Sequence, residues 1–185
     1  MVDDIFFTIK SIIGFGSKSQ SWKHWISVLD LKTCEECRSQ HGKIYAIEES
    51  VSNSPPLHMN CRCEIKLMNT ITSGKCSNKG QDGADWCLMF ENRLPEYYIS
   101  KDDLLSKGWY YGKDPSKYAP GTMVFGGIFR NDDGLLPEKE GRVWFEADIN
   151  YISGRRNGHR LLWSNDGLFF VTYNHYQTFI EVVGG

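Results

Sequence analysis

The sequence has no excess of positive charge: its 185 residues carry 21 Lys and Arg against 23 Asp and Glu, a formal net charge of -2. Proteins that bind a polyanion over a broad surface usually have a clear surplus of Lys and Arg. If this chain binds a polyanion, its basic groups must therefore gather at one local site. Internal repeats and low-complexity tracts are missing too, and hydrophobic residues make up 41% of the chain, which argues against wholesale disorder.

The sequence also lacks a long hydrophobic run. Residues 1–16 contain an apolar patch, but the segment is too short to span a bilayer and lacks the basic start and small-residue cleavage site of a signal peptide. Its isoleucines lie near helical spacing, which predicts a helix packed on the rest of the protein. We therefore expect no membrane span and, if the protein leaves its cell, a non-classical route.

The chain is expected to divide at residues 69–83, which are poor in large apolar residues and rich in Gly, Ser, Thr and Asn, as in linkers. Residues 1–68 would form a small Cys- and His-bearing module, and residues 84–185 a second domain. The second domain begins with two predicted helices, at residues 84–92 and from the N-cap Ser100 onward. From Met123 the pattern changes to short apolar runs separated by turn residues, so we predict an α+β fold with a largely antiparallel sheet.

Five potential metal ligands lie in two clusters of the first module: Cys34 and Cys37, then His58, Cys61 and Cys63. Two close pairs separated by about twenty residues suit a tetrahedral zinc ion, because each pair can hold one edge of the tetrahedron. We favour Cys34, Cys37, His58 and Cys61, with Cys63 in reserve. Such a zinc ion would be structural. Disulfides are the alternative, because the six cysteines are an even number.

A carboxylate, a histidine and several arginines occur in the predicted sheet. Glu146 lies two residues before Asp148, so strand alternation places both on one face, and His175 lies in the last hairpin. The arginines follow in the next turn and strand: Arg155, Arg156 and Arg160. These groups can supply a general base, a general acid and stabilisation of an anion, which is what metal-free cleavage of RNA requires. Their spacing alone favours a structural interpretation, in which the carboxylates pair with the arginines and the histidine lies on the surface.

Longer motifs favour the catalytic interpretation. LPEYYISK at 94–101, GRVWFEADINY at 141–151, GRRNGHRLLWS at 154–164 and HYQTF at 175–179 resemble the barnase-like microbial ribonucleases in order and spacing, over residues 80–185. The resemblance implies N-terminal helices, a five-stranded antiparallel sheet, and cleavage of single-stranded RNA to a 2′,3′-cyclic phosphate without metal or cofactor. It implies Glu146 as general base and His175 as general acid, with Lys101, Arg156 and Arg160 around the scissile phosphate.

The same resemblance implies a site for guanine, formed by Phe129, Arg130, Asn131, Asp132 and Asp133, with Tyr176 lining the substrate site. Asp133 would accept hydrogen bonds from guanine N1 and N2. Two residues depart from the family pattern: Asp132 stands where the family has Arg, and Gly127 stands where an Asp is found. An Asp near the phosphate path repels substrate, so both departures bear on base preference and RNA affinity.

A second resemblance covers residues 22–67. Here WISVLDLKTCEECRSQHGKIYAIEE and PPLHMNCRC resemble phage minor head morphogenesis proteins, which implies a structural or delivery element. Together the two resemblances imply a bacterial toxin or effector, delivered into a target cell, with RNA as substrate and an acidic, barstar-like immunity protein as partner. The alternative is a phage-derived structural or assembly protein that carries an inactive ribonuclease fold.

Overall fold

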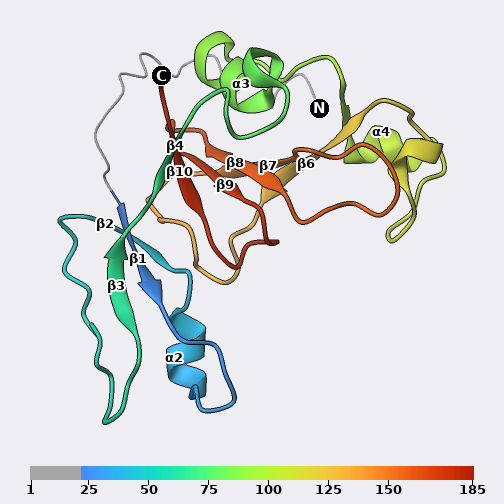
Figure 1. Ribbon diagram of the computed structural model, residues 1–185. Helices are drawn as coiled ribbons and strands as arrows, with labels where there is room; N and C mark the ends of the chain where they lie inside the picture. The colour runs from blue at the N-terminus through green and yellow to red at the C-terminus, as the bar shows by residue number, and fades with distance from the viewer. Residues whose placement is uncertain (1–21) are drawn as a thin grey trace.

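The computed structural model describes residues 22–185, which form two β-sheets and few helices (Figure 1). The expected helix within residues 1–16 lies outside this range. The smaller sheet has the order β2-β1-β3 and the larger sheet the order β4-β10-β9-β8-β7-β6-β5. The strands are β1 (Trp22–Ile26), β2 (Ile44–Ala46), β3 (Glu64–Leu67), β4 (Thr70–Thr72), β5 (Tyr98–Ser100), β6 (Met123–Phe129), β7 (Trp144–Asp148), β8 (Arg160–Ser164), β9 (Phe169–Thr172) and β10 (Ile180–Val183).

The helices of the described chain are short: α2 (Glu35–Gln40), α3 (Ala84–Glu91), α4 (Lys101–Ser106), and the 3₁₀ turns η1 (Gly80–Asp82) and η2 (Pro115–Lys117). Both helices predicted after residue 83 are confirmed, and Ser100 caps α4 by accepting a hydrogen bond from the Asp103 amide. The α+β class is also confirmed. Within residues 22–185 none of the helices has the length and hydrophobicity needed to cross a membrane.

The expected sheet of five strands is wrong in number, since the larger sheet has seven. Strands β6 to β10 are each antiparallel to their neighbours, but β5 adds a parallel strand at one edge and β4 adds another at the opposite edge. Strand β4 comes from the segment 69–83, whose composition resembles a linker. Edge strands as short as three residues depend on main-chain pairing with a neighbour, so they leave little hydrophobic pattern to detect.

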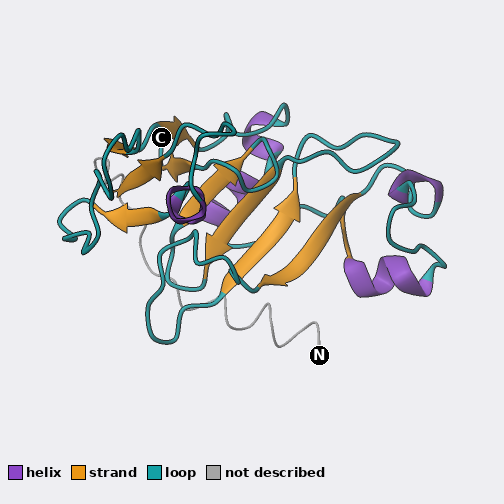
Figure 2. Ribbon diagram, turned by 90° about the horizontal axis from the view of Figure 1, so that it is seen from below, coloured by secondary structure: helices purple, strands orange, loops and turns teal. Residues whose placement is uncertain are grey.

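The larger sheet buries both of its faces, and Figure 1 shows α3 on one side and the small sheet with α2 on the other. The first face carries Phe145, Leu161 and Trp163, which pack with Leu88 and Met89 of α3. The second face carries Trp144, Leu162 and Phe170, in one cluster with Ile44 and Met68 from the N-terminal part of the chain. Figure 2 shows the strands of the larger sheet side by side, with α4 beyond one edge.

Residues 22–68, hereafter the Cys/His module, contact the larger sheet through side chains and contact two of its loops through the backbone. The amide of Ile44 donates to the carbonyl of Leu135 at 2.9 Å. Beside it, Gly42 has φ +87°, and a Cβ at this position would lie 3.0 Å from the carbonyl oxygen of Gln177. The close contact therefore requires glycine, both for its backbone conformation and for its lack of a side chain.

Replacing Gly42 with alanine should weaken this contact. A left-handed backbone costs a non-glycine residue about 1–2 kcal/mol, and the new methyl would also press on Gln177. The matched control is Gly121→Ala, because Gly121 has φ +77° and open space around a built Cβ. Thermal unfolding should show a larger loss of stability for Gly42→Ala than for Gly121→Ala; equal losses would contradict a tight contact at Gly42.

Candidate active site and metal centre

The register of β7 and β8 places the predicted catalytic carboxylate on the second face of the sheet. Glu146 pairs with Leu162, and Asp148 pairs with Arg160. On the other side of β7 the pairing with β6 shifts between Phe125 and Gly127, as in a β-bulge. A Cβ at Gly126 would lie 2.5 Å from Glu146 Oε1. The bulge and this glycine together make the space that the Glu146 side chain fills.

Asp148 is fully buried and binds two arginines. Arg156 donates through Nε and Nη2 to the two carboxylate oxygens, at 2.7 and 2.6 Å. Arg160 Nε lies 3.0 Å from Oδ1, and its Nη1 donates to the main-chain carbonyls of Asn157 and His159. Asp148 thus fixes the direction of both arginines.

The electrostatics of Arg156 follow from this geometry. Burial acts to lower the pKa of its guanidinium, but the hydrogen bonds and charge of Asp148, together with the charge of Glu146, raise that pKa above its ordinary value. Arg156 is therefore a permanent cation. Only two of its five N–H donors are used by Asp148, so others remain available to an anion.

His175 and Tyr176 lie in the hairpin between β9 and β10, and both have positive φ, 56° and 70°. Such a backbone costs on the order of 1–3 kcal/mol for each non-glycine residue, so surrounding contacts must hold it. The His175 amide donates to the Gly158 carbonyl at 2.9 Å, and the Tyr176 amide donates to Thr172 Oγ1 at 3.1 Å. A Cβ at Gly158 would lie 3.0 Å from the His175 nitrogen, so the approach of the two loops requires glycine there.

Tyr176 joins the two residues that we expect to transfer protons. Its hydroxyl donates a hydrogen bond to Glu146 Oε2, and its ring centre lies 4.7 Å from that of His175. Burial, followed by the charge and hydrogen bond of Glu146, raises the pKa of Tyr176. Tyr176 therefore remains a neutral donor that orients the carboxylate.

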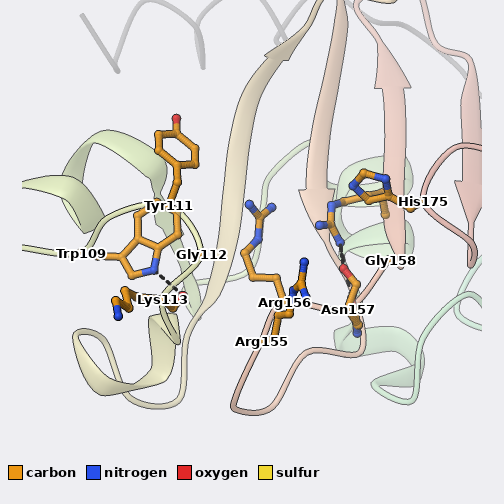
Figure 3. Close-up of a pocket in the computed structure, with 10 residues that line it drawn as sticks. Trp109, Tyr111, Gly112, Lys113, Arg155, Arg156, Asn157, Gly158 and His175 are labelled. Atoms are coloured by element: carbon orange, nitrogen blue, oxygen red, sulfur yellow. Dashed lines mark hydrogen bonds between the residues drawn. The ribbon is translucent and has the colours of Figure 1, made fainter.

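A cavity of about 470 Å³ lies beside these groups and is lined by cations (Figure 3). Its cations are Arg155, Arg156, Arg160 and Lys113, and His175 adds an imidazole to the wall. Figure 3 shows these side chains coming from two directions, with Trp109 held by a hydrogen bond from Nε1 to the Lys113 carbonyl, 2.8 Å long. The chain has no overall positive charge, yet it concentrates positive groups here, and the cavity suits a phosphate.

Lys101, one of the predicted site residues, lies near the cation-lined cavity but does not line it. It begins α4, and its ammonium lies 5.9 Å from the ring centre of Tyr111, which lines the cation-lined cavity. Lys101 itself is not among the residues that line this cavity. Its expected position at a scissile phosphate stays a prediction.

The predicted base-binding residues form a separate cavity of about 320 Å³, which also includes Glu146 and Tyr176. Asn131 shapes its loop: it has φ +52°, and its side chain accepts from the amides of Leu135 and Leu136. The Phe129 ring stacks on Tyr176, with centroids 5.2 Å apart. Asp132 binds Arg130 at 2.7 Å in an exposed pair, so part of its charge is offset. Asp133 is exposed on the same wall.

The expected metal ligands gather in the Cys/His module. Cys34 Sγ and Cys37 Sγ each lie 3.2 Å from His58 Nε2, and Cys37 Sγ lies 3.7 Å from Cys61 Sγ. Ligands of a tetrahedral zinc ion are separated by about 3.5–3.8 Å, given its bond lengths, so these residues could hold a metal ion. Cys63 also lies near Cys37 and Cys61, and its sulfur is 3.3 Å from Ser27 Oγ. All six cysteines fall within the described residues, and each is a free thiol.

Some residues at the site were not identified from the sequence. Trp109, Tyr111, Lys113 and Asn157 line the cation-lined cavity. The run WYYGK at 109–113 combines aromatic and basic residues and could have pointed to them. No sequence signal indicates that the Cys/His module lies against the loop of Asp133 and Leu135, because that contact depends on tertiary packing.

Comparison with known proteins agrees with both resemblances. Residues 16–66 match the family described as Phage Mu protein F like protein. A ribonuclease of Bacillus pumilus is 38% identical over 69% of this chain and 78% of its own length. A ribonuclease of Bacillus intermedius is 43% identical over 64% of this chain and 73% of its own, and one of Heyndrickxia coagulans is 43% identical over 54% and 91%. By sequence, motifs and α+β architecture, this chain belongs to the family of these barnase-like microbial ribonucleases.

Proposed function

We propose that this protein is an endoribonuclease that cleaves single-stranded RNA on the 3′ side of guanosine without a catalytic metal. The observation that supports it best is the convergence of Glu146, Arg156, Arg160 and His175 around Tyr176 and Asp148, at the edge of a cation-lined cavity. This set contains a proton acceptor, a proton donor and fixed cations, each on a different segment of the sheet.

The proposed reaction has two steps. In the first, Glu146 takes the proton of the ribose 2′-OH, the 2′-oxygen bonds to phosphorus, the bond from phosphorus to the 5′-oxygen breaks, and His175 protonates that oxygen. In the second, His175 takes a proton from water, the water oxygen opens the 2′,3′-cyclic phosphate, and Glu146 protonates the 2′-oxygen. Arg156 and Arg160 offset the charge that grows on the phosphate oxygens. Lys101 is proposed, from the resemblance, to add a third cation near the phosphate.

Removing either proton-transfer group tests this assignment. Glu146→Ala and His175→Ala should each lower the cleavage rate of a guanine-containing RNA by about 10²- to 10⁴-fold. Glu140→Ala, which removes an exposed carboxylate away from both cavities, should cleave at the parent rate. Circular dichroism should show all three variants folded. Parent activity in both Glu146→Ala and His175→Ala would refute the roles.

The products test the mechanism independently. Cleavage should continue in excess EDTA, and the first product should carry a 2′,3′-cyclic phosphate detectable by mass spectrometry. Restoration by added Mg²⁺ or Mn²⁺ of activity lost in EDTA would contradict metal-free catalysis. A protein that binds but never cleaves RNA would instead favour the alternative, a phage-derived structural or assembly protein, which the match of residues 16–66 makes worth testing.

We further propose that the loop of residues 129–133 selects guanine through Asp133, with main-chain amides near Asn131. Among the dinucleotides GpA, ApA, CpA and UpA, GpA should be cleaved fastest. Asp133→Ala should reduce that preference by about 5- to 150-fold, which corresponds to about 1–3 kcal/mol for a paired base contact. Asp132→Ala is the control, because removing its charge should raise the rates of all four substrates alike. If Asp133→Ala and the parent showed the same preference for GpA, Asp133 would be excluded as the residue that selects guanine.

For the Cys/His module we propose a structural zinc ion held by Cys34, Cys37, His58 and Cys61. His58 Nδ1 lies 2.9 Å from the Met59 carbonyl, a contact of the kind that orients a ligating imidazole. The ion would cross-link the loop before α2 to the segment of His58 and Cys61, which otherwise has little packing to hold it.

Metal analysis of protein purified under reducing conditions should find one zinc per chain. Cys34→Ser should lose the ion and unfold at a lower temperature. Cys63→Ser should retain the ion, because in this assignment the Cys63 sulfur contacts Ser27 Oγ and does not bind the metal. Loss of zinc in Cys63→Ser with retention in Cys34→Ser would reverse the ligand assignment.

As to biological role, we propose a bacterial toxin or effector, delivered to its target cell by a non-classical route, with an acidic immunity protein as partner. The support is chemical: an accessible cavity with Arg155, Arg156 and Arg160 in its wall fits a carboxylate-rich surface of the barstar kind.

A further inference from the structure

A third cavity, of about 390 Å³, lies between the Cys/His module and the hairpin that follows β9, next to the proposed catalytic groups. The module supplies Leu29, Arg38 and His41 to its wall, and the hairpin supplies His175, Tyr176 and Gln177. Tyr176, Asp133 and Leu135 also line the cavity of the base-binding loop, and His175 also lines the cation-lined cavity. The three cavities therefore meet at His175 and Tyr176.

The wall from the module is held in place by backbone and side-chain contacts. The Ser27 amide donates to His41 Nδ1 at 3.0 Å, and Ser27 Oγ donates to the Cys37 carbonyl at 2.6 Å. Arg38 Nη2 donates to the Asp30 carbonyl at 2.8 Å. The strand after His41 is tied to the loop of the base-binding cavity through Ile44 and Leu135. This wall is therefore preorganised for a ligand.

The chemistry of the cavity differs from that of the cation-lined cavity. Leu29 and Leu135 present aliphatic surface, and Tyr176, His41 and His175 present rings. Polar groups on the wall come from Arg38, Gln177 and Asp133, and Asp133 lies on the side shared with the base-binding loop. Apolar and aromatic walls with a few polar groups are typical of sites for a flat base, whereas clustered guanidinium groups suit a phosphate.

We propose that this cavity binds the base of the leaving nucleoside, so that the Cys/His module forms one wall of the nuclease's substrate groove. The inference rests on the proposed function. There, His175 protonates the 5′-oxygen of the leaving nucleoside, and this nucleoside must lie beside His175. The cation-lined cavity holds the phosphate and the loop of residues 129–133 holds the guanine, which leaves the cavity under the module for the second base.

Two leucines of one loop allow a matched test. Leu29 lines the cavity and is 48% exposed, whereas Leu31 is fully exposed and is not part of that wall. Leu29→Glu should lower kcat/KM for GpA by about tenfold, because it replaces apolar contact with the second base by a carboxylate that must stay hydrated. Leu31→Glu adds the same charge to the same loop and should leave kcat/KM within twofold of the parent.

Hydrolysis of guanosine 2′,3′-cyclic phosphate supplies an internal control, because this substrate has no leaving nucleoside. Leu29→Glu should hydrolyse it at the parent rate and should unfold at the parent temperature. Equal kcat/KM for GpA in Leu29→Glu and the parent would overturn the subsite, as would an equal loss in Leu31→Glu or an equal loss on the cyclic phosphate. A parent protein that cleaves neither substrate would refute the proposed function itself, which separates the two failures.

Discussion

The buried carboxylate of Asp148 is the interaction on which the site depends. A fully buried charge is tolerated only when it is paired and hydrogen-bonded, and Asp148 meets this condition through two hydrogen bonds from Arg156 and an ion pair with Arg160. The same pairing prevents the two guanidinium groups, which come from a loop and from β8, from turning toward solvent. Removing the carboxylate would leave both cations without their partner and the cavity without a fixed lining.

Close approach between segments is the second constraint, and it rests on small residues at specific places. Gly126 leaves room for the Glu146 side chain, and Gly158 lets the loop of the arginines reach the hairpin of His175. The positive φ values of His175 and Tyr176 show that the hairpin is held in a conformation that side chains do not favour. A sheet that stored no such strain would point these two side chains elsewhere.

The Cys/His module is joined to the nuclease by a shared apolar cluster and by a backbone hydrogen bond, as well as by the intervening chain. Ile44 and Met68 bury the same sheet face that, further along the strands, carries Glu146 and Asp148. Strand β4, within the segment expected to be a linker, extends the sheet at β10. The division of the chain into two domains stays a prediction, and the contacts between its two parts are extensive.

The sequence alone determined the features that depend on local pattern. Strand alternation put Glu146 and Asp148 on one face, and the cap at Ser100 began α4, because each follows from residues close together in the chain. The ribonuclease motifs identified the family and indicated Arg156, Arg160 and His175 as candidate site residues. Tertiary structure decided what depends on distant segments. Within the site, Asp148 binds both arginines and the Tyr176 hydroxyl reaches Glu146. Around the site, two three-residue strands extend the sheet, and the module places Leu29, Arg38 and His41 beside the hairpin. Contacts of this kind arise from packing and main-chain pairing between segments far apart in sequence, which leave no periodic trace in either segment.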